Sequence, residues 1–125
     1  MNTLQQRLND CLPVAEALCR ALGDEVGRLG LDPTMLAGAD PLGAEFRLQT
    51  DPASGGESLV GEWFDRHRCR VGMLLLHADG SCFAEHDIVC PHPTNPRLFV
   101  EAVEAWGRGQ DIRCEARLMP MLDDT

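Results

Sequence analysis

The chain has 125 residues, a length that fits one domain, and its 44% hydrophobic and 25% charged content is typical of a folded protein. Twenty acidic residues against eleven basic ones give a formal net charge of −9, which disfavours binding to nucleic-acid phosphates and to anionic membranes. Every basic residue is arginine, so a lysine Schiff base and a lysine acid or base are excluded.

The first ten residues contain no apolar segment of the secretory-signal kind, and no apolar run approaches the length of a membrane span. We therefore expect a cytoplasmic protein that is not embedded in a membrane. In a reducing compartment its six cysteines are thiols or metal ligands rather than disulfides.

The N-terminal third predicts a long amphipathic helix, because leucine, alanine and valine recur every three or four residues from Leu4 to Leu29. Pro13 predicts either a kink in this helix or its first turn, and Gly30 is a suitable C-terminal cap. Residues 32–38 then have the composition of one short turn of helix with Asp32 as N-cap.

From Ala44 the apolar period changes to two, which predicts a half-buried strand over about residues 44–49. Further strands are expected at residues 58–64, 69–78 and 81–90, and Asp79-Gly80 predicts a tight hairpin between the last two.

Three prolines end the fourth strand, and the spacing of Phe99, Ala102, Val103 and Trp106 then predicts a second helix from about residue 94 to Gly107. A final alternating strand is expected over residues 111–118.

The predicted order is thus an N-terminal helix, a four-strand antiparallel meander, a second helix and a last strand. This pattern indicates the α+β class with the helices packed on the sheet. A single domain is expected over residues 1–125, with residues 119–125 as a frayed tail.

The register of the Asp79-Gly80 hairpin decides which chemistry-bearing side chains meet. A two-residue loop places His77 opposite Cys82, a pairing that can activate a cysteine nucleophile in a small enzyme. The same loop sets two imidazoles and two thiols on one side of the ribbon, a possible zinc site: His67, Cys69, Cys90 and His92.

A three-residue loop with a glycine bulge shifts the register by one residue and disperses these groups over both faces. The sequence leaves the choice between the two loops open. For the four residues we favour a structural interpretation, in which Cys69 and Cys90 are small buried apolar residues and both histidines lie in loops. Cys69 and Cys90 facing each other in the two-residue register could also form a redox-linked pair.

Two further groups are candidates for ligand binding. Arg66, Arg68 and Arg70 form the local basic cluster of an acidic chain and could hold a carboxylate or phosphate, although such clusters are usually solvated. His92 lies in a stiff, proline-rich connection of the kind that often carries sites.

The sequence contains no recognisable catalytic set, phosphate loop or nucleophile elbow. It therefore favours a non-enzymatic binding or interaction module for a small molecule or a protein partner. A structural or regulatory zinc-binding protein and a small Cys/His enzyme are the alternatives. No cofactor is predicted apart from the possible zinc, and a homodimer through an open sheet edge is a further expectation.

Overall fold

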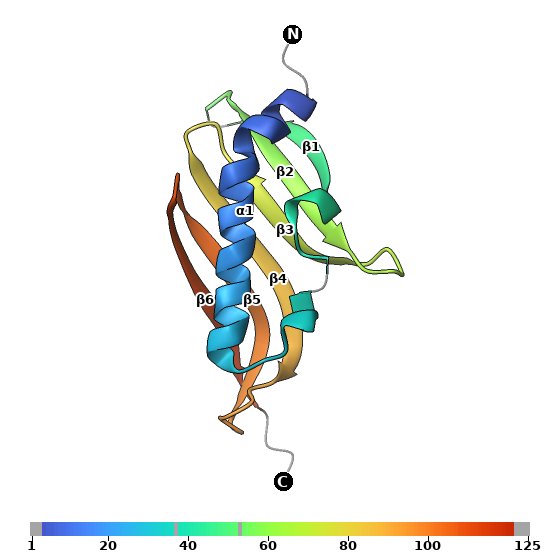
Figure 1. Cartoon of the computed structure of the whole chain (residues 1–125), viewed down its shortest axis with the longest axis vertical. Helices are drawn as coiled ribbons and strands as arrows, with labels where there is room; N and C mark the ends of the chain where they lie inside the picture. Colours follow the sequence, from blue (N-terminus) through green and yellow to red (C-terminus); the bar gives the residue numbers. More distant parts are fainter. Residues whose placement is uncertain (1–3, 37, 53, 122–125) are drawn as a thin grey trace.

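The computed structural model describes residues 4–36, 38–52 and 54–121. One long helix lies across one face of a six-stranded antiparallel sheet (Figure 1). Each strand pairs with the next one in the chain, so the sheet is a simple meander. None of the helices in this part of the chain combines the length and apolar character needed to cross a bilayer.

Helix α1 (Leu4–Leu29) matches the predicted amphipathic helix and continues through Pro13. The face it turns to the sheet is fully or almost fully buried and carries Ala15, Leu18, Ala21, Leu22 and Val26. After it come two short 3-10 turns, η1 (Pro33–Leu36) and η2 (Pro41–Gly43). Asp32 caps the first of them as expected, accepting a 2.9 Å hydrogen bond from the Thr34 N–H.

The sheet consists of β1 (Glu45–Thr50), β2 (Glu57–Phe64), β3 (Arg70–Leu76), β4 (Ser81–Pro91), β5 (Leu98–Arg108) and β6 (Asp111–Pro120). Their order in the sheet is the order in the chain, with β1 and β6 at the two edges. One core lies between α1 and the sheet, and its strand residues include Leu59, Trp63, Leu74, Ala84 and Val103.

The predicted second helix is wrong: residues 98–108 form strand β5, so the sheet has six strands instead of the expected four-strand meander and separate last strand. The helix-like spacing has a physical cause. The register of β5 against β6 slips between Val100 and Ala102, so Glu101 is an extra residue. Such a bulge adds one residue to a strand in which side chains otherwise alternate between the two faces. The apolar residues on either side of the bulge then recur at three- and four-residue intervals, as they do in a helix.

Tertiary pairing decides the conformation of this segment. β5 pairs with β4 along one side and with β6 along the other, and Gly109 with a φ of 62° closes the hairpin to β6. A helix here would leave the backbone of β4 unpaired on that side. The expected tail is also shorter than predicted, because Met119 and Pro120 belong to β6, while residues 122–125 lie outside the described residues.

Candidate functional site

The sheet has a second face, which α1 does not cover, and we call it the uncovered face. Cross-strand pairing builds an apolar row on it: Val60, Leu75, Phe83 and Trp106, with Arg47 at one end and Arg113 at the other. Beside it runs a row that is mostly glutamate: Glu45, Glu62, Met73, Glu85, Glu104 and Glu115. A sheet covered on one side usually turns polar residues to the other, so the apolar row is a departure from that pattern.

Arginines neutralise much of the glutamate row. Arg117 contacts Glu104 at 2.5 Å, Glu101 at 3.1 Å and Glu85 at 3.3 Å, and Glu62 pairs with Arg47 and Arg70. These side chains are partly exposed, so each pair contributes at most about 1 kcal/mol. In the apolar row Val60 is buried, and Leu75, Phe83 and Trp106 are half-buried.

A hollow of about 210 Å³ opens at one end of this face. Two connections and the strand ends beside them line it: the β1–β2 connection contributes Asp51, Ser54 and Gly56, β2 contributes Ser58, and the β3–β4 hairpin contributes His77, Ala78, Asp79 and Ser81. The lining therefore offers hydroxyls, carboxylates and one imidazole to a ligand.

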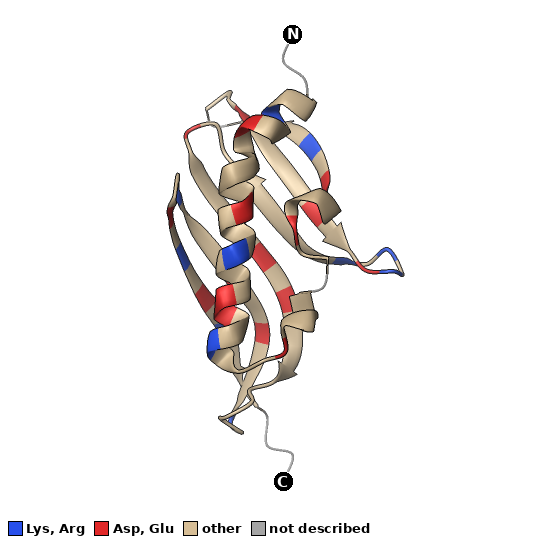
Figure 2. Cartoon of the chain, in the orientation of Figure 1, with Lys and Arg blue, Asp and Glu red and all other residues tan. Residues whose placement is uncertain are grey.

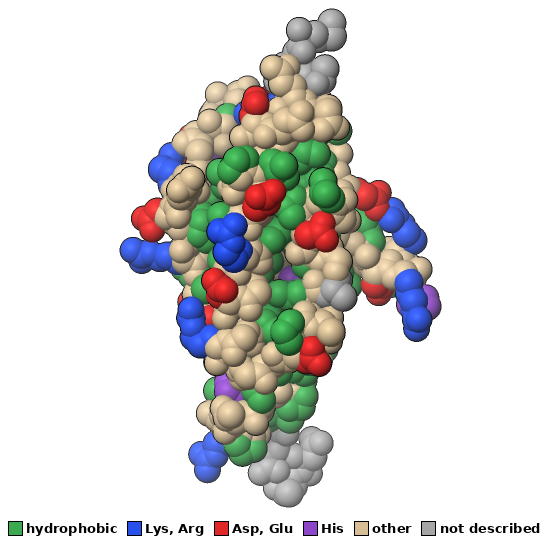
Figure 3. Space-filling view, in the orientation of Figure 1, with side chains coloured by type: hydrophobic (Ala, Val, Ile, Leu, Met, Phe, Trp, Pro, Cys, Tyr) green, Lys and Arg blue, Asp and Glu red, His purple; other side chains and the backbone are tan. Residues whose placement is uncertain are grey.

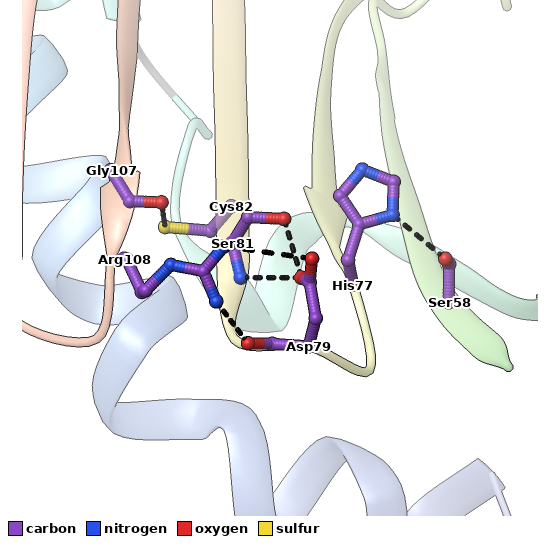
Figure 4. A network of polar contacts seen from close by, with 7 residues as sticks. All are labelled: Ser58, His77, Asp79, Ser81, Cys82, Gly107 and Arg108. Atoms are coloured by element: carbon purple, nitrogen blue, oxygen red, sulfur yellow. Dashed lines mark hydrogen bonds and ion pairs between the residues drawn. The ribbon is translucent and has the colours of Figure 1, made fainter. Parts of the chain in front are cut away.

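Two residues of the lining, Ser58 and His77, contact each other (Figure 4). Ser58 Oγ and His77 Nδ1 share a hydrogen bond of 2.9 Å, and Ser58 is only 5% exposed. The two residues come from the adjacent strands β2 and β3, whose register sets Leu59 opposite Leu76 and hence Ser58 beside His77. Strand pairing therefore positions this polar pair.

Asp79 holds the hairpin that forms one wall of the hollow. Its Oδ1 accepts hydrogen bonds from the Ser81 hydroxyl at 2.6 Å and the Ser81 N–H at 2.9 Å (Figure 4). These bonds, the hydroxyl first, lower the pKa of the Asp79 carboxyl below its ordinary value. Arg108 of β5 lies 3.6 Å from the other carboxylate oxygen. The wall therefore carries an Asp79–Arg108 ion pair and is held by local hydrogen bonds.

The hairpin is the three-residue loop with a glycine bulge. His77 N–H donates to Ser81 O at 2.9 Å, Gly80 N–H donates to His77 O at 3.1 Å, and Gly80 has a φ of 93°. In this register Cys82 lies opposite Leu76 rather than His77.

Cys82 and His77 consequently lie on opposite faces of the sheet. The Cys82 thiol is buried beneath α1, donates to Gly107 O at 3.4 Å, and has a pKa that burial raises. The structure does not bring this thiol and this imidazole together.

The four residues of the possible zinc site are also apart. His67 and Cys69 lie in the β2–β3 connection, which projects from the side of the molecule (Figure 1). Cys90 is the next-to-last residue of β4, away from that connection. His92 turns its Nδ1 to its own loop, where it accepts hydrogen bonds of 3.1 Å from the N–H groups of Thr94 and Asn95. Among the described residues no group of three or more His, Cys, Asp or Glu side chains is placed to hold a metal ion.

The three candidate arginines point to separate partners. Arg68 pairs with Glu45 and lies 4.4 Å above the Phe64 ring, Arg70 contacts Glu62 at 3.4 Å, and Arg66 donates to the neighbouring His67 ring at 3.3 Å. In the space-filling view the connection that carries Arg66 and Arg68 stands clear of the body (Figure 3). These arginines do not converge on one anion.

All six cysteines are free thiols. Cys19 of α1 is the most perturbed, since burial, followed by the carboxylates of Asp40 and Glu16, raises its pKa to about 12. A thiol in that environment stays protonated and unreactive at neutral pH.

Sequence reasoning found His77 but missed Ser58 as its partner. The signal was present, because Ser58 opens the second predicted strand and His77 is the next-to-last residue of the third. To predict that Ser58 and His77 are neighbours, one must know the register of the two strands. That register depends on the length of their connection and on a bulge between Trp63 and Phe64.

Comparisons with known proteins add nothing to this geometry: no protein-family model, no curated protein and no solved structure matches the chain.

Proposed function

We propose that this protein is a binding module for one small polar molecule, held in the hollow at the end of the uncovered face. The observation that carries the proposal is the hydrogen bond between Ser58 and His77 in the lining of that hollow. Buried polar pairs next to a cavity are typical of sites that orient a ligand by a few hydrogen bonds.

The lining favours a small hydroxylated amine. Asp51 and Asp79 supply carboxylate oxygens, and Ser54 and Ser81 supply hydroxyls that both donate and accept. The net charge of −9 attracts cations from a distance. A hollow of about 210 Å³ is somewhat larger than the roughly 150 Å³ cavity that accommodates benzene, so the ligand is of that size.

Binding is favoured over catalysis by what surrounds the imidazole. A serine nucleophile needs a base that a third group orients, and donors that stabilise the developing oxyanion. Within the described residues the ring of His77 forms a hydrogen bond with Ser58 alone, through Nδ1. A Ser58 side chain only 5% exposed also presents little of its hydroxyl to a substrate.

The composition supports a proposal for the cellular compartment and for the class of ligand. Six free thiols favour a reducing cytoplasm, and the charge of −9 disfavours nucleic acid as a ligand.

Titration with ethanolamine, followed by amide proton–nitrogen correlation spectra, tests the function. We expect saturable shifts confined to the hollow, with a dissociation constant of roughly 1–10 mM for so small a probe. Acetate, which has the opposite charge, should give no saturable shift there.

Variants give the test its control. His77→Ala should weaken binding by about tenfold, the usual consequence of removing one well-placed hydrogen bond to a charged ligand. Ser58→Ala should weaken it less, because the Ser58 hydroxyl positions the imidazole ring. His67→Ala removes an exposed loop histidine outside the hollow and should bind like the parent. Equal shifts with acetate, or unchanged binding in His77→Ala, would refute the proposal.

A further inference from the structure

Strand β6 is a long open edge. It has ten residues, and within the described chain it pairs with β5 alone. Its other side therefore presents backbone N–H and C=O groups, the arrangement through which sheet edges join. Blue and red segments follow one another along this edge strand, at the left of Figure 2.

Three of the four charged residues of β6 between positions 111 and 117 form no ion pair within the described part of the protomer, whereas the fourth, Arg117, pairs with Glu85, Glu101 and Glu104. No ion pair in the described part of the chain involves Asp111, Arg113 or Glu115. Glu115 even faces Glu104 of β5, and like charges directly opposite each other destabilise a sheet.

The other edge of the sheet differs. On β1, Glu45 pairs with Arg68 and Arg47 pairs with Glu62, so both charges of that strand are satisfied internally. Charged residues without an ion-pair partner in the described chain, Asp111, Arg113 and Glu115, are thus a property of the β6 edge.

We propose that β6 pairs antiparallel with β6 of a second copy of this chain, about a two-fold axis at Cys114. In this register Arg113 of each copy lies opposite Glu115 of the other, and Asp111 lies opposite Arg117. Ile112 lies opposite Ala116, and the two Cys114 residues face each other on the axis. Each charged residue from 111 to 117 then lies opposite a residue of the opposite charge in the other copy.

Neighbouring registers lack this complementarity. A centre at Arg113 or at Glu115 sets like charges against each other on the axis. A centre at Ala116 keeps the Glu115–Arg117 pairing but places Arg113 opposite Met119. A two-fold axis requires facing residues to lie on the same side of the sheet, so half-step registers are excluded.

The dimer also completes the edge of the core. Ile112, Cys114 and Ala116 pack against the buried cluster but remain only partly buried in the protomer. Pairing would cover their open side and join two six-stranded sheets into one, with both α1 helices on the same side.

Charge exchange tests the register. Light scattering coupled to gel filtration should give the parent protein twice the 13.7 kDa mass of one chain. Arg113→Glu and Glu115→Arg should each raise the dimer dissociation constant by about tenfold or more, because each creates two like-charge contacts. The combined variant restores the pairing with signs exchanged and should recover the dimer.

Far-UV circular dichroism checks that the variants fold, which we expect since both side chains are exposed. A monomeric parent, or single variants that dimerise like the parent, would overturn the proposal.

Oxidation gives an independent measurement. Facing residues of an antiparallel pair have Cα atoms about 5.5 Å apart, within the range that a disulfide spans. Diamide should therefore link the two Cys114 thiols, taking up the two electrons and two protons they release. Cys69 is more exposed and is the control for random collision. A cross-link through Cys69 with none through Cys114 would contradict the register.

Discussion

Gly72 of β3 occupies a position where a side chain has no room. A Cβ added there would lie 2.6 Å from Glu85 O and 2.9 Å from Cε3 of Trp63, which stands opposite on β2. The Trp63 indole fills the space over this glycine, contacts the His86 ring at a centroid distance of 5.9 Å, and donates from Nε1 to Asp40 O at 2.9 Å. One residue without a side chain thus lets the sheet hold the segment that leads from α1 to β1.

We predict that Gly72→Ala lowers the free energy of unfolding by about 1–3 kcal/mol, because a rigid backbone carbonyl and a buried ring must move. The same change at Gly23, an exposed site in α1 with no atom within 4 Å of its added Cβ, should raise it by about 0.5–1 kcal/mol. Urea unfolding measures both. A neutral Gly72→Ala would show that Trp63 is not held against β3.

At the scale of elements, the hairpin of β4 and β5 is shaped by its bulges. Between Asp87 and Cys90 the strand β4 has two residues, Ile88 and Val89, opposite the single Glu101 of β5. Val89 takes a φ of 56° and is 65% exposed. A β-branched residue is strained in this left-handed region, which asparagine adopts more readily.

Val89→Asn is therefore predicted to raise the free energy of unfolding by about 1 kcal/mol. Thr50→Asn, the same loss of a β-branched residue at an exposed position in the extended strand β1, should instead lower it by a few tenths of a kcal/mol. Thermal or urea unfolding distinguishes the two. If both variants lose stability alike, the bulge does not hold Val89 in the left-handed conformation.

For the whole molecule, the single helix gives the sheet two unlike faces. α1 covers one face, and the core beneath it contains Trp63, which is 2% exposed. Trp106 lies on the uncovered face and is only half-buried. The two tryptophans therefore report on the two faces separately.

Acrylamide quenching measures this difference. The variant Trp106→Phe keeps only the buried indole and should show a blue-shifted emission with a small quenching slope. Trp63→Phe keeps only the indole of the uncovered face and should be quenched more steeply. The reverse order would mean that α1 covers the other face.

Sequence alone determined the elements whose pattern is local. The apolar stripe from Leu4 to Leu29 has the helical period, and the alternation of β1 and β6 has the strand period. The helix and these two strands can therefore be predicted from the sequence without tertiary information. Asp79-Gly80 likewise predicts a hairpin, because glycine readily adopts the positive φ of the turn.

Only the tertiary structure decided β5, the hairpin register and the hollow. Residues 98–108 have a helix-like spacing because of a bulge, and their strand conformation comes from pairing on both sides. The loop beyond His77 has three residues, a choice that the dipeptide leaves open and that places His77 and Cys82 on opposite faces. Ser58 and His77 meet because strand pairing joins residues 19 apart in the chain, a contact that no local pattern contains.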